Sequence, residues 1–186
     1  MKNKVMFRRE AARKNICTKA YPPIPIRGSG TLDLSGVVDQ YSQLKLKAGW
    51  RIYTSFDYVY AMVNEETGTD DLMAGITGDE SPLSYLQATV CYHHLMEYSV
   101  NKTDLISQAI LDDDYLRQLN LMGKWNIRNI KRSLNPVFFY DSLMHPVVIL
   151  FTYHQEGIQV IQKHIHRFNC ESYKLKTLQR NWAILS

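Results

Sequence analysis

The sequence has few cysteines, and they form no recognisable pair. Its 186 residues include three, Cys17, Cys91 and Cys170, which are widely spaced and make no CxxC motif. An odd number at such spacings argues against the disulfide framework of a secreted domain. The thiols are therefore expected to be reduced, which predicts a cytoplasmic protein.

Long apolar runs are also missing. None approaches the ~18 residues that a membrane helix needs. The basic N-terminus, residues 1–15, is not followed by the apolar segment of a secretory signal. The chain is therefore not expected to enter a membrane.

Signatures of catalysis are absent as well. No GxSxG motif occurs, and no cysteine lies in a recognisable catalytic context. Gly28-Ser29-Gly30 lacks the following Lys-Ser/Thr of a phosphate-binding loop. Nucleotide chemistry has no support, and the sequence leaves both the cofactor and enzymatic activity open.

What is present is the composition of a globular protein. Hydrophobic residues make up 45% and charged residues 22% of a chain whose length suits one domain. Residues 1–30 are basic and punctuated by proline and glycine, which predicts an N-terminal arm. Residues 31–186 are predicted to form a single α+β domain.

Helices are predicted in the middle of this domain. Ser81-Pro82 suits the start of a helix that runs to about Val100, with apolar residues on two sides that indicate burial. Asp112-Asp113-Asp114 would cap another helix, which Gly123 ends. Further helices are predicted from Thr103 and over residues 124–134.

Strand formers dominate on both sides of the helical segment. Residues 50–63 predict one long strand or two strands, followed by an acidic loop over 64–80. Residues 137–185 predict several more strands, with a β-hairpin over 145–168. A mainly antiparallel sheet built from both regions is expected, with the helices packed on it. The spacing of isoleucines over 158–168 also fits a helix.

Three blocks of the sequence resemble a conserved family of hypothetical proteins of unknown function. They are Gly49-Trp50-Arg51, residues 78–88 (GDESPLSYLQA), and the C-terminal elements Phe151-Thr152-Tyr153, His166 and residues 172–177 (SYKLKT). The resemblance extends over roughly residues 45–180 and implies strands at the C-terminus, which favours the hairpin. The Trp- and His-bearing stretch of that family is missing between Glu97 and Leu111. The resemblance implies a fold and no function.

The net charge of +4 is unevenly distributed. Residues 1–20 carry a net charge of +6, residues 21–123 of −8 and residues 124–186 of +6. Basic and acidic segments that pair within the fold would explain this pattern, and so would a basic face that binds an anion. The candidate binding residues of such a face are Lys124, Arg128, Lys131, Arg132, Lys174 and Lys176.

Histidines offer a second candidate site. On a strand, His164 and His166 share a face, so both imidazoles could reach one metal ion, with His145 as a third ligand. Hydrogen-bonded strand histidines are the alternative. His93 and Glu97 have the spacing of a pair on one helix face, which is more often structural than catalytic.

The leading hypothesis is a non-enzymatic interaction module that binds an acidic protein or nucleic acid through its basic ends. The alternative is a small metal-dependent or histidine-based hydrolase with its site on the C-terminal sheet.

Overall fold

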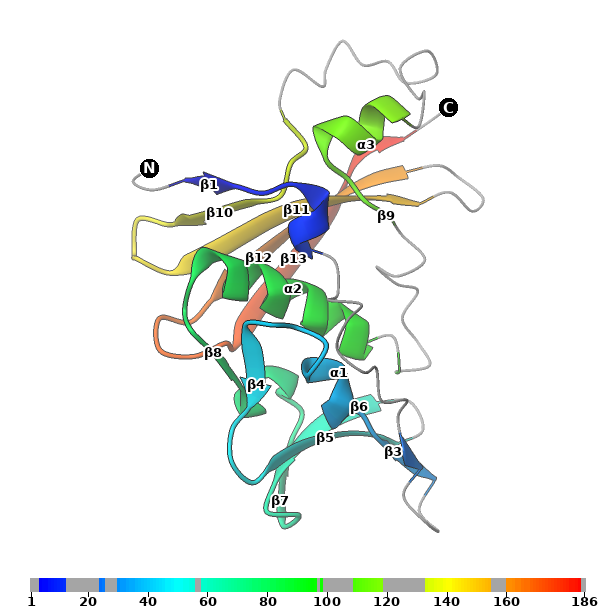
Figure 1. The fold of residues 1–186 in the computed structure, drawn as a ribbon, viewed down its shortest axis with the longest axis vertical. Helices are drawn as coiled ribbons and strands as arrows, with labels where there is room; N and C mark the ends of the chain where they lie inside the picture. The colour runs from blue at the N-terminus through cyan, green and yellow to red at the C-terminus, as the bar shows by residue number, and fades with distance from the viewer. Residues whose placement is uncertain are drawn as a thin grey trace.

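The computed structural model has the expected α+β architecture, with mainly antiparallel sheets (Figure 1). It describes residues 4–12, 24–25, 30–55, 58–96, 98, 109–118, 133–154 and 160–184. The helices within these ranges are η1 (Arg9–Ala12), α1 (Ser35–Val38), η2 (Leu72–Gly75), α2 (Pro82–Met96) and α3 (Asp113–Gln118). The predicted helices from Thr103 and over 124–134 fall outside the described residues.

The largest sheet belongs to the C-terminal part of the chain. Its strand order is β1 (Val5–Met6), β10 (Val137–Tyr140), β11 (Pro146–His154), β12 (Val160–Phe168) and β13 (Leu175–Ile184), and β9 (Ala109–Ile110) pairs with β11. The predicted hairpin is confirmed, since β11 and β12 pair antiparallel with Val148 opposite His166. The helical interpretation of residues 158–168 is wrong for the part that lies in β12.

Residues 50–63 form two strands, and these belong to a different sheet. β2 (Ile24–Pro25), β3 (Thr31–Asp33), β5 (Trp50–Ser55), β6 (Tyr58–Val63) and β7 (Thr67–Thr69) follow one another in this second sheet. β4 (Leu44–Leu46) and β8 (Ile76–Gly78) make a third, two-stranded sheet. The expected single sheet is therefore wrong, and the predicted acidic loop over 64–80 contains β7, η2 and β8.

The physical reason is the helix α2, which lies between the sheets in Figure 1. Its N-terminus is capped as predicted, because the Ser84 amide donates to Ser81 Oγ at 3.1 Å. A helix with apolar side chains all round can support packing on two sides. Leu86, Ala88 and Leu95 are all fully buried.

Aromatic rings join α2 to the C-terminal sheet. The Tyr85 ring, 3% exposed, lies 5.6 Å from that of Phe138, 5.0 Å from that of Phe168 and 5.1 Å from that of Tyr173. The Tyr173 hydroxyl also accepts a hydrogen bond from the Glu80 amide at 2.9 Å. The turn between β12 and β13 is thereby fixed to the start of α2.

Parts of the N-terminal arm pack on the domain. Val5 of β1 lies opposite Phe138 of β10. The Arg9 amide donates to Asp112 Oδ2, and the Arg9 guanidinium lies 3.7 Å from the centre of the Tyr115 ring. Asp112 Oδ1 accepts from the Tyr115 amide at 2.7 Å, so this carboxylate caps α3 as predicted.

Gly78 lies where β8 approaches the β12–β13 turn. A Cβ at this position would lie 2.6 Å from both the Gln43 carbonyl oxygen and Tyr173 Oη. Gly78→Ala is therefore expected to lower the free energy of unfolding by about 1–3 kcal/mol in urea denaturation. Gly68→Ala is the control, because its Cβ would come no closer than 3.7 Å to another atom and should change stability little. Equal effects of the two substitutions would contradict the close approach at Gly78.

Candidate functional site

Four cations gather on one face of the β12–β13 hairpin. Side chains alternate between the two faces of a strand, and His164 and His166 face α2. Lys163 and Arg167 therefore point to the opposite, outer face, together with their cross-strand partners Arg180 and Lys176. We call Lys163, Arg167, Lys176 and Arg180 the basic face.

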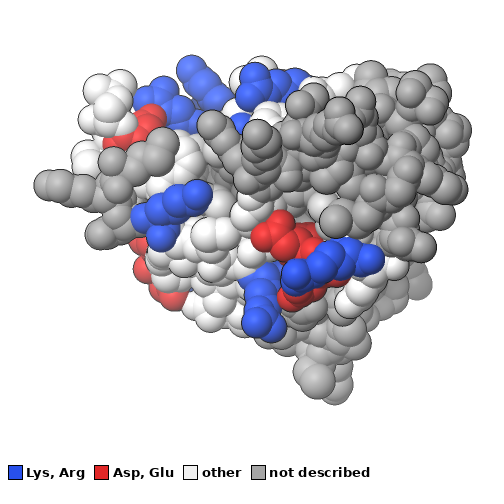
Figure 2. Space-filling view, turned by 90° about the horizontal axis from the view of Figure 1, so that it is seen from above, with Lys and Arg blue, Asp and Glu red and all other residues white. Residues whose placement is uncertain are grey.

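The basic face pairs like charges directly. Arg167 lies opposite Lys176, and Lys163 lies opposite Arg180. Between these two pairs lies an apolar pair, Ile165 opposite Leu178. Leu178 is 57% exposed. Figure 2 views the molecule from the side of α3, the outer side of this sheet, and Lys and Arg side chains gather along the upper edge of the view. The result is a cationic surface with an exposed apolar side chain at its centre.

Two of the four cations have partners nearby. Arg167 Nε donates to Asp141 Oδ2 at 2.7 Å, and the Lys163 ammonium lies 5.3 Å from the centre of the Trp182 ring. Lys176 and Arg180 are exposed, and the described part of the chain offers neither an acidic partner. Their charges are thus accessible to a ligand.

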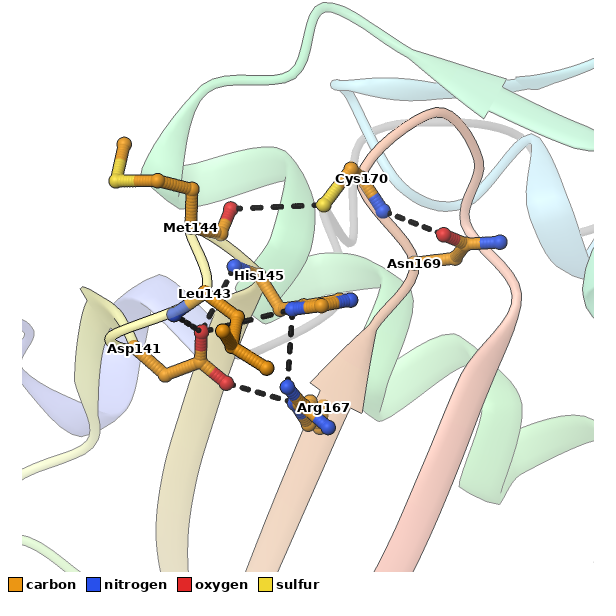
Figure 3. Close-up of polar contacts among 7 residues, drawn as sticks. All are labelled: Asp141, Leu143, Met144, His145, Arg167, Asn169 and Cys170. Carbon is orange, nitrogen blue, oxygen red and sulfur yellow. Dashed lines mark hydrogen bonds and ion pairs between the residues drawn. The ribbon is translucent and has the colours of Figure 1, made fainter.

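The turn before β11 holds Arg167 in place (Figure 3). Asp141 Oδ1 accepts hydrogen bonds from the Leu143 and His145 amides, both at 2.9 Å. Partial burial alone would raise the pKa of Asp141, but these hydrogen bonds and that from Arg167 lower it. Arg167 also donates to His145 Nδ1 at 2.9 Å, because a guanidinium nitrogen can only donate. The carboxylate stays ionised and keeps the guanidinium on the outer face.

A pocket of about 300 Å³ adjoins this network. It is lined by His145, Arg167, Phe168, Asn169, Lys174, Leu175 and Lys176. Its lining includes three cationic side chains and no carboxylate. Lys174 has an acidic partner outside the pocket, since its ammonium lies 3.1 Å from Asp71 Oδ2. The pocket extends the positive surface from the basic face to the end of the hairpin.

The structure describes only part of the predicted binding set. Lys124, Arg128, Lys131 and Arg132 lie outside the described residues. Lys176 belongs to the basic face, whereas Lys174 lies in the turn before β13. Sequence reasoning missed Lys163 and Arg167. Their spacing on one strand was a usable signal, but their opposition to Arg180 and Lys176 depends on a register that only the structure provides.

The predicted histidine pair lies beneath α2. His164 and His166 are 2% and 0% exposed, and their rings lie 5.5 and 4.8 Å from that of His93. The Nε2 atoms of His93 and His166 are 2.6 Å apart, and His164 Nε2 bonds Thr152 Oγ1 at 2.9 Å. Among the described residues, buried His166 Nδ1 has no hydrogen-bond partner. The group is an imidazole cluster in which His164 and His166 are buried and His93 is half-buried. The sequence paired His93 with Glu97, which lies outside the described residues, and did not place it beside the strand histidines.

Burial keeps two of these imidazoles neutral. Desolvation lowers the pKa of His164 to about 4. Desolvation, together with the neighbouring His164, lowers the pKa of His166 to about 3. Both side chains are therefore uncharged at neutral pH and add no charge to the surface.

The structure does not bring the three predicted metal ligands together. His145 bonds Arg167 on the outer face, whereas His164 and His166 face α2 on the other side of the sheet. The Nε2 atoms of His93 and His166, 2.6 Å apart, share a short hydrogen bond in which one ring donates and the other accepts. Across the described ranges, no group of three or more His, Cys, Asp or Glu side chains is arranged to hold a metal ion.

Within the described ranges, no helix has the length and hydropathy required to cross a membrane. No family model, curated protein or solved structure matches the chain.

Proposed function

We propose that this protein is a non-enzymatic interaction module that binds an anionic partner through the basic face. The observation that carries the proposal is the opposition of like charges, Arg167 with Lys176 and Lys163 with Arg180. Like charges directly opposite each other on a sheet destabilise it by a few tenths of a kcal/mol to about 1 kcal/mol. An anion placed between them would remove this repulsion.

The composition of the hairpin supports the proposal. Residues 160–184 contain five Lys or Arg residues and one acid, Glu171, which gives a net charge of +4. Exposed cations on one surface raise the rate of encounter with an anionic partner. Both an acidic protein and a nucleic acid supply such a partner.

Accessibility separates this proposal from the alternative of a histidine-based hydrolase. Lys176, Arg180 and the side chain of Leu178 are exposed to solvent. His164 and His166 are almost fully covered. The basic face is therefore open to a ligand, whereas the side chains of His164 and His166 are covered.

Binding to a polyanion is expected to weaken steeply with salt. With two to four cations engaged, the affinity for fluorescein-labelled polyglutamate or single-stranded DNA should fall about tenfold or more between ~50 and ~200 mM salt. The double variant Lys176→Glu/Arg180→Glu should bind neither probe measurably at ~50 mM salt. Fluorescence anisotropy measures both effects.

Lys45→Glu is the matched control. Lys45 is an exposed lysine on β4, in the two-stranded sheet, and its substitution changes the net charge without touching the basic face. It should reduce affinity only slightly. If Lys45→Glu weakened binding as much as a single reversal at Lys176 or Arg180, overall charge would explain the effect and the basic face would not be the site.

A further inference from the structure

We infer that β13 binds an extended acidic segment of a partner protein as an added β-strand. The inference rests on the proposed function and names its partner class. It concerns the free edge of β13 as well as the side chains of the basic face.

The edge of β13 that faces away from β12 is long, and no described strand pairs with it. Among the described strands, β13 pairs only with β12, over register positions that extend from Leu175 to Ile184. All six residues 176–181 are exposed. An edge strand presents a row of backbone N–H and C=O groups, and ten residues give a row about 33 Å long. Main-chain hydrogen bonds to such a row are the basis of strand addition.

The polar side chains of β13 on the α2 side turn towards β12. Gln179 Nε2 donates to Gln162 Oε1 at 2.7 Å, and Gln162 Nε2 donates to Asn181 Oδ1 at 3.3 Å. These amides satisfy one another across the hairpin. They therefore do not occupy the hydrogen-bonding groups on the free side of β13.

Lysines on an edge strand often serve to prevent unwanted pairing. Here, however, Lys176 and Arg180 flank Leu178, which is 57% exposed and offers an apolar contact. A second copy of this chain is a poor occupant, because antiparallel pairing centred on Leu178 would place Lys176 opposite Arg180. In an added acidic strand, carboxylates would instead lie opposite Lys176 and Arg180, and both contacts would be attractive.

The three outer side chains of β13 define the sequence of the occupant. Lys176, Leu178 and Arg180 lie at alternate positions, so the complementary strand has the pattern Glu-x-Val-x-Glu on one face. The pattern reads the same in both directions and suits parallel and antiparallel addition. Small polar residues at x would face Thr177 and Gln179.

The test uses a labelled peptide, Ser-Glu-Thr-Val-Thr-Glu-Ser, and two N-methylated forms of it. One form carries N-methyl groups on both glutamates and the other on both threonines, so the two have equal charge and equal numbers of methyl groups. Alternate residues of a strand direct their N–H groups to opposite edges. Strand addition therefore predicts that one form alone loses affinity, by about tenfold or more, because two main-chain hydrogen bonds are blocked.

The outcomes separate this inference from the proposed function. A loss confined to one methylated form, together with loss of peptide binding in Lys176→Glu/Arg180→Glu, supports strand addition. If both methylated forms bind as tightly as the parent peptide, or if single-stranded DNA binds and the peptide does not, strand addition is wrong and anion binding by the basic face stands. If neither the peptide nor the DNA binds the native protein at ~50 mM salt, both proposals fail.

Discussion

Lowering the pH from 7 to 4.5 is expected to reduce the free energy of unfolding by roughly 4–6 kcal/mol through His164 and His166. Burial lowers the pKa of His164 to about 4, and burial with the neighbouring His164 lowers that of His166 to about 3. In the unfolded chain both titrate near 6.5. Between pH 6.5 and 4 the unfolded state therefore binds more protons than the folded state, so the free energy of unfolding falls as the pH is lowered. Urea denaturation at several pH values, followed by tryptophan fluorescence, measures the effect.

Two variants test whether the buried imidazoles cause this dependence. His164→Gln/His166→Gln removes both titrating groups, so the stability difference between pH 7 and 4.5 should shrink by most of that amount. Thr152→Val removes the hydroxyl that bonds His164 and should lower stability at both pH values while the difference remains. Each single histidine variant should remove about half of the difference. An undiminished pH dependence in the histidine variants would mean that other groups titrate.

Carboxylates extend the acid sensitivity to lower pH. A side-chain hydrogen bond from Ser81 is the main cause that lowers the pKa of Asp79. In Asp141 the lowering by hydrogen bonds outweighs the effect of desolvation. Their stabilisation is present above their unfolded pKa of about 4 and is lost below it. The range from pH 6.5 to 4 therefore reports the histidines with little contribution from these two groups.

Tyr85→Ala is expected to lower the free energy of unfolding by about 3–5 kcal/mol and the melting temperature by about 10 °C or more. The ring is 3% exposed and contacts Phe138, Phe168 and Tyr173, so its removal opens a cavity between α2 and the C-terminal sheet. Thermal unfolding followed by circular dichroism measures the change.

Tyr85→Phe is the matched control, because it keeps the ring and removes only the hydroxyl. It should cost much less than Tyr85→Ala. If the two substitutions destabilise the protein equally, the hydroxyl rather than the stacked ring fixes α2 to the sheet. A loss below about 1 kcal/mol in Tyr85→Ala would show that the cavity collapses.

The sequence predicted the elements that depend on interactions between residues close together in the chain. Ser81-Pro82 predicted the start of α2, and apolar residues on two sides of this helix predicted its burial. The β11–β12 hairpin followed from two apolar segments around a short break. The division into separate sheets was not predictable. The sequence shows that α2 has two apolar faces, but it does not show that the two faces pack on different sheets. β7 and β8 were missed because three-residue strands are too short to show an alternation.

The candidate site divides in the same way. Residues 137–185 were predicted to form strands, and Lys176 lies on one of them, β13. The partners of Lys176 and Arg180 depend on the register of the β12–β13 hairpin, which the sequence does not show. The contact of His93 with His166 joins residues 73 positions apart and is set by how α2 packs on the sheet.

The position of α2 between two sheets has a consequence for synthesis on the ribosome. The strands β3 to β8 all precede α2 in the sequence. They can therefore cover one side of the helix as soon as it has been synthesised. Phe138 and Phe168, on which Tyr85 stacks, emerge more than 50 and more than 80 residues after Tyr85. Until then the other side of the helix, including His93, has no sheet to cover it. Such exposed apolar surface makes nascent chains prone to aggregate, and chaperones bind it. The aromatic contacts that stabilise the folded protein therefore cannot form until the C-terminal strands have been synthesised.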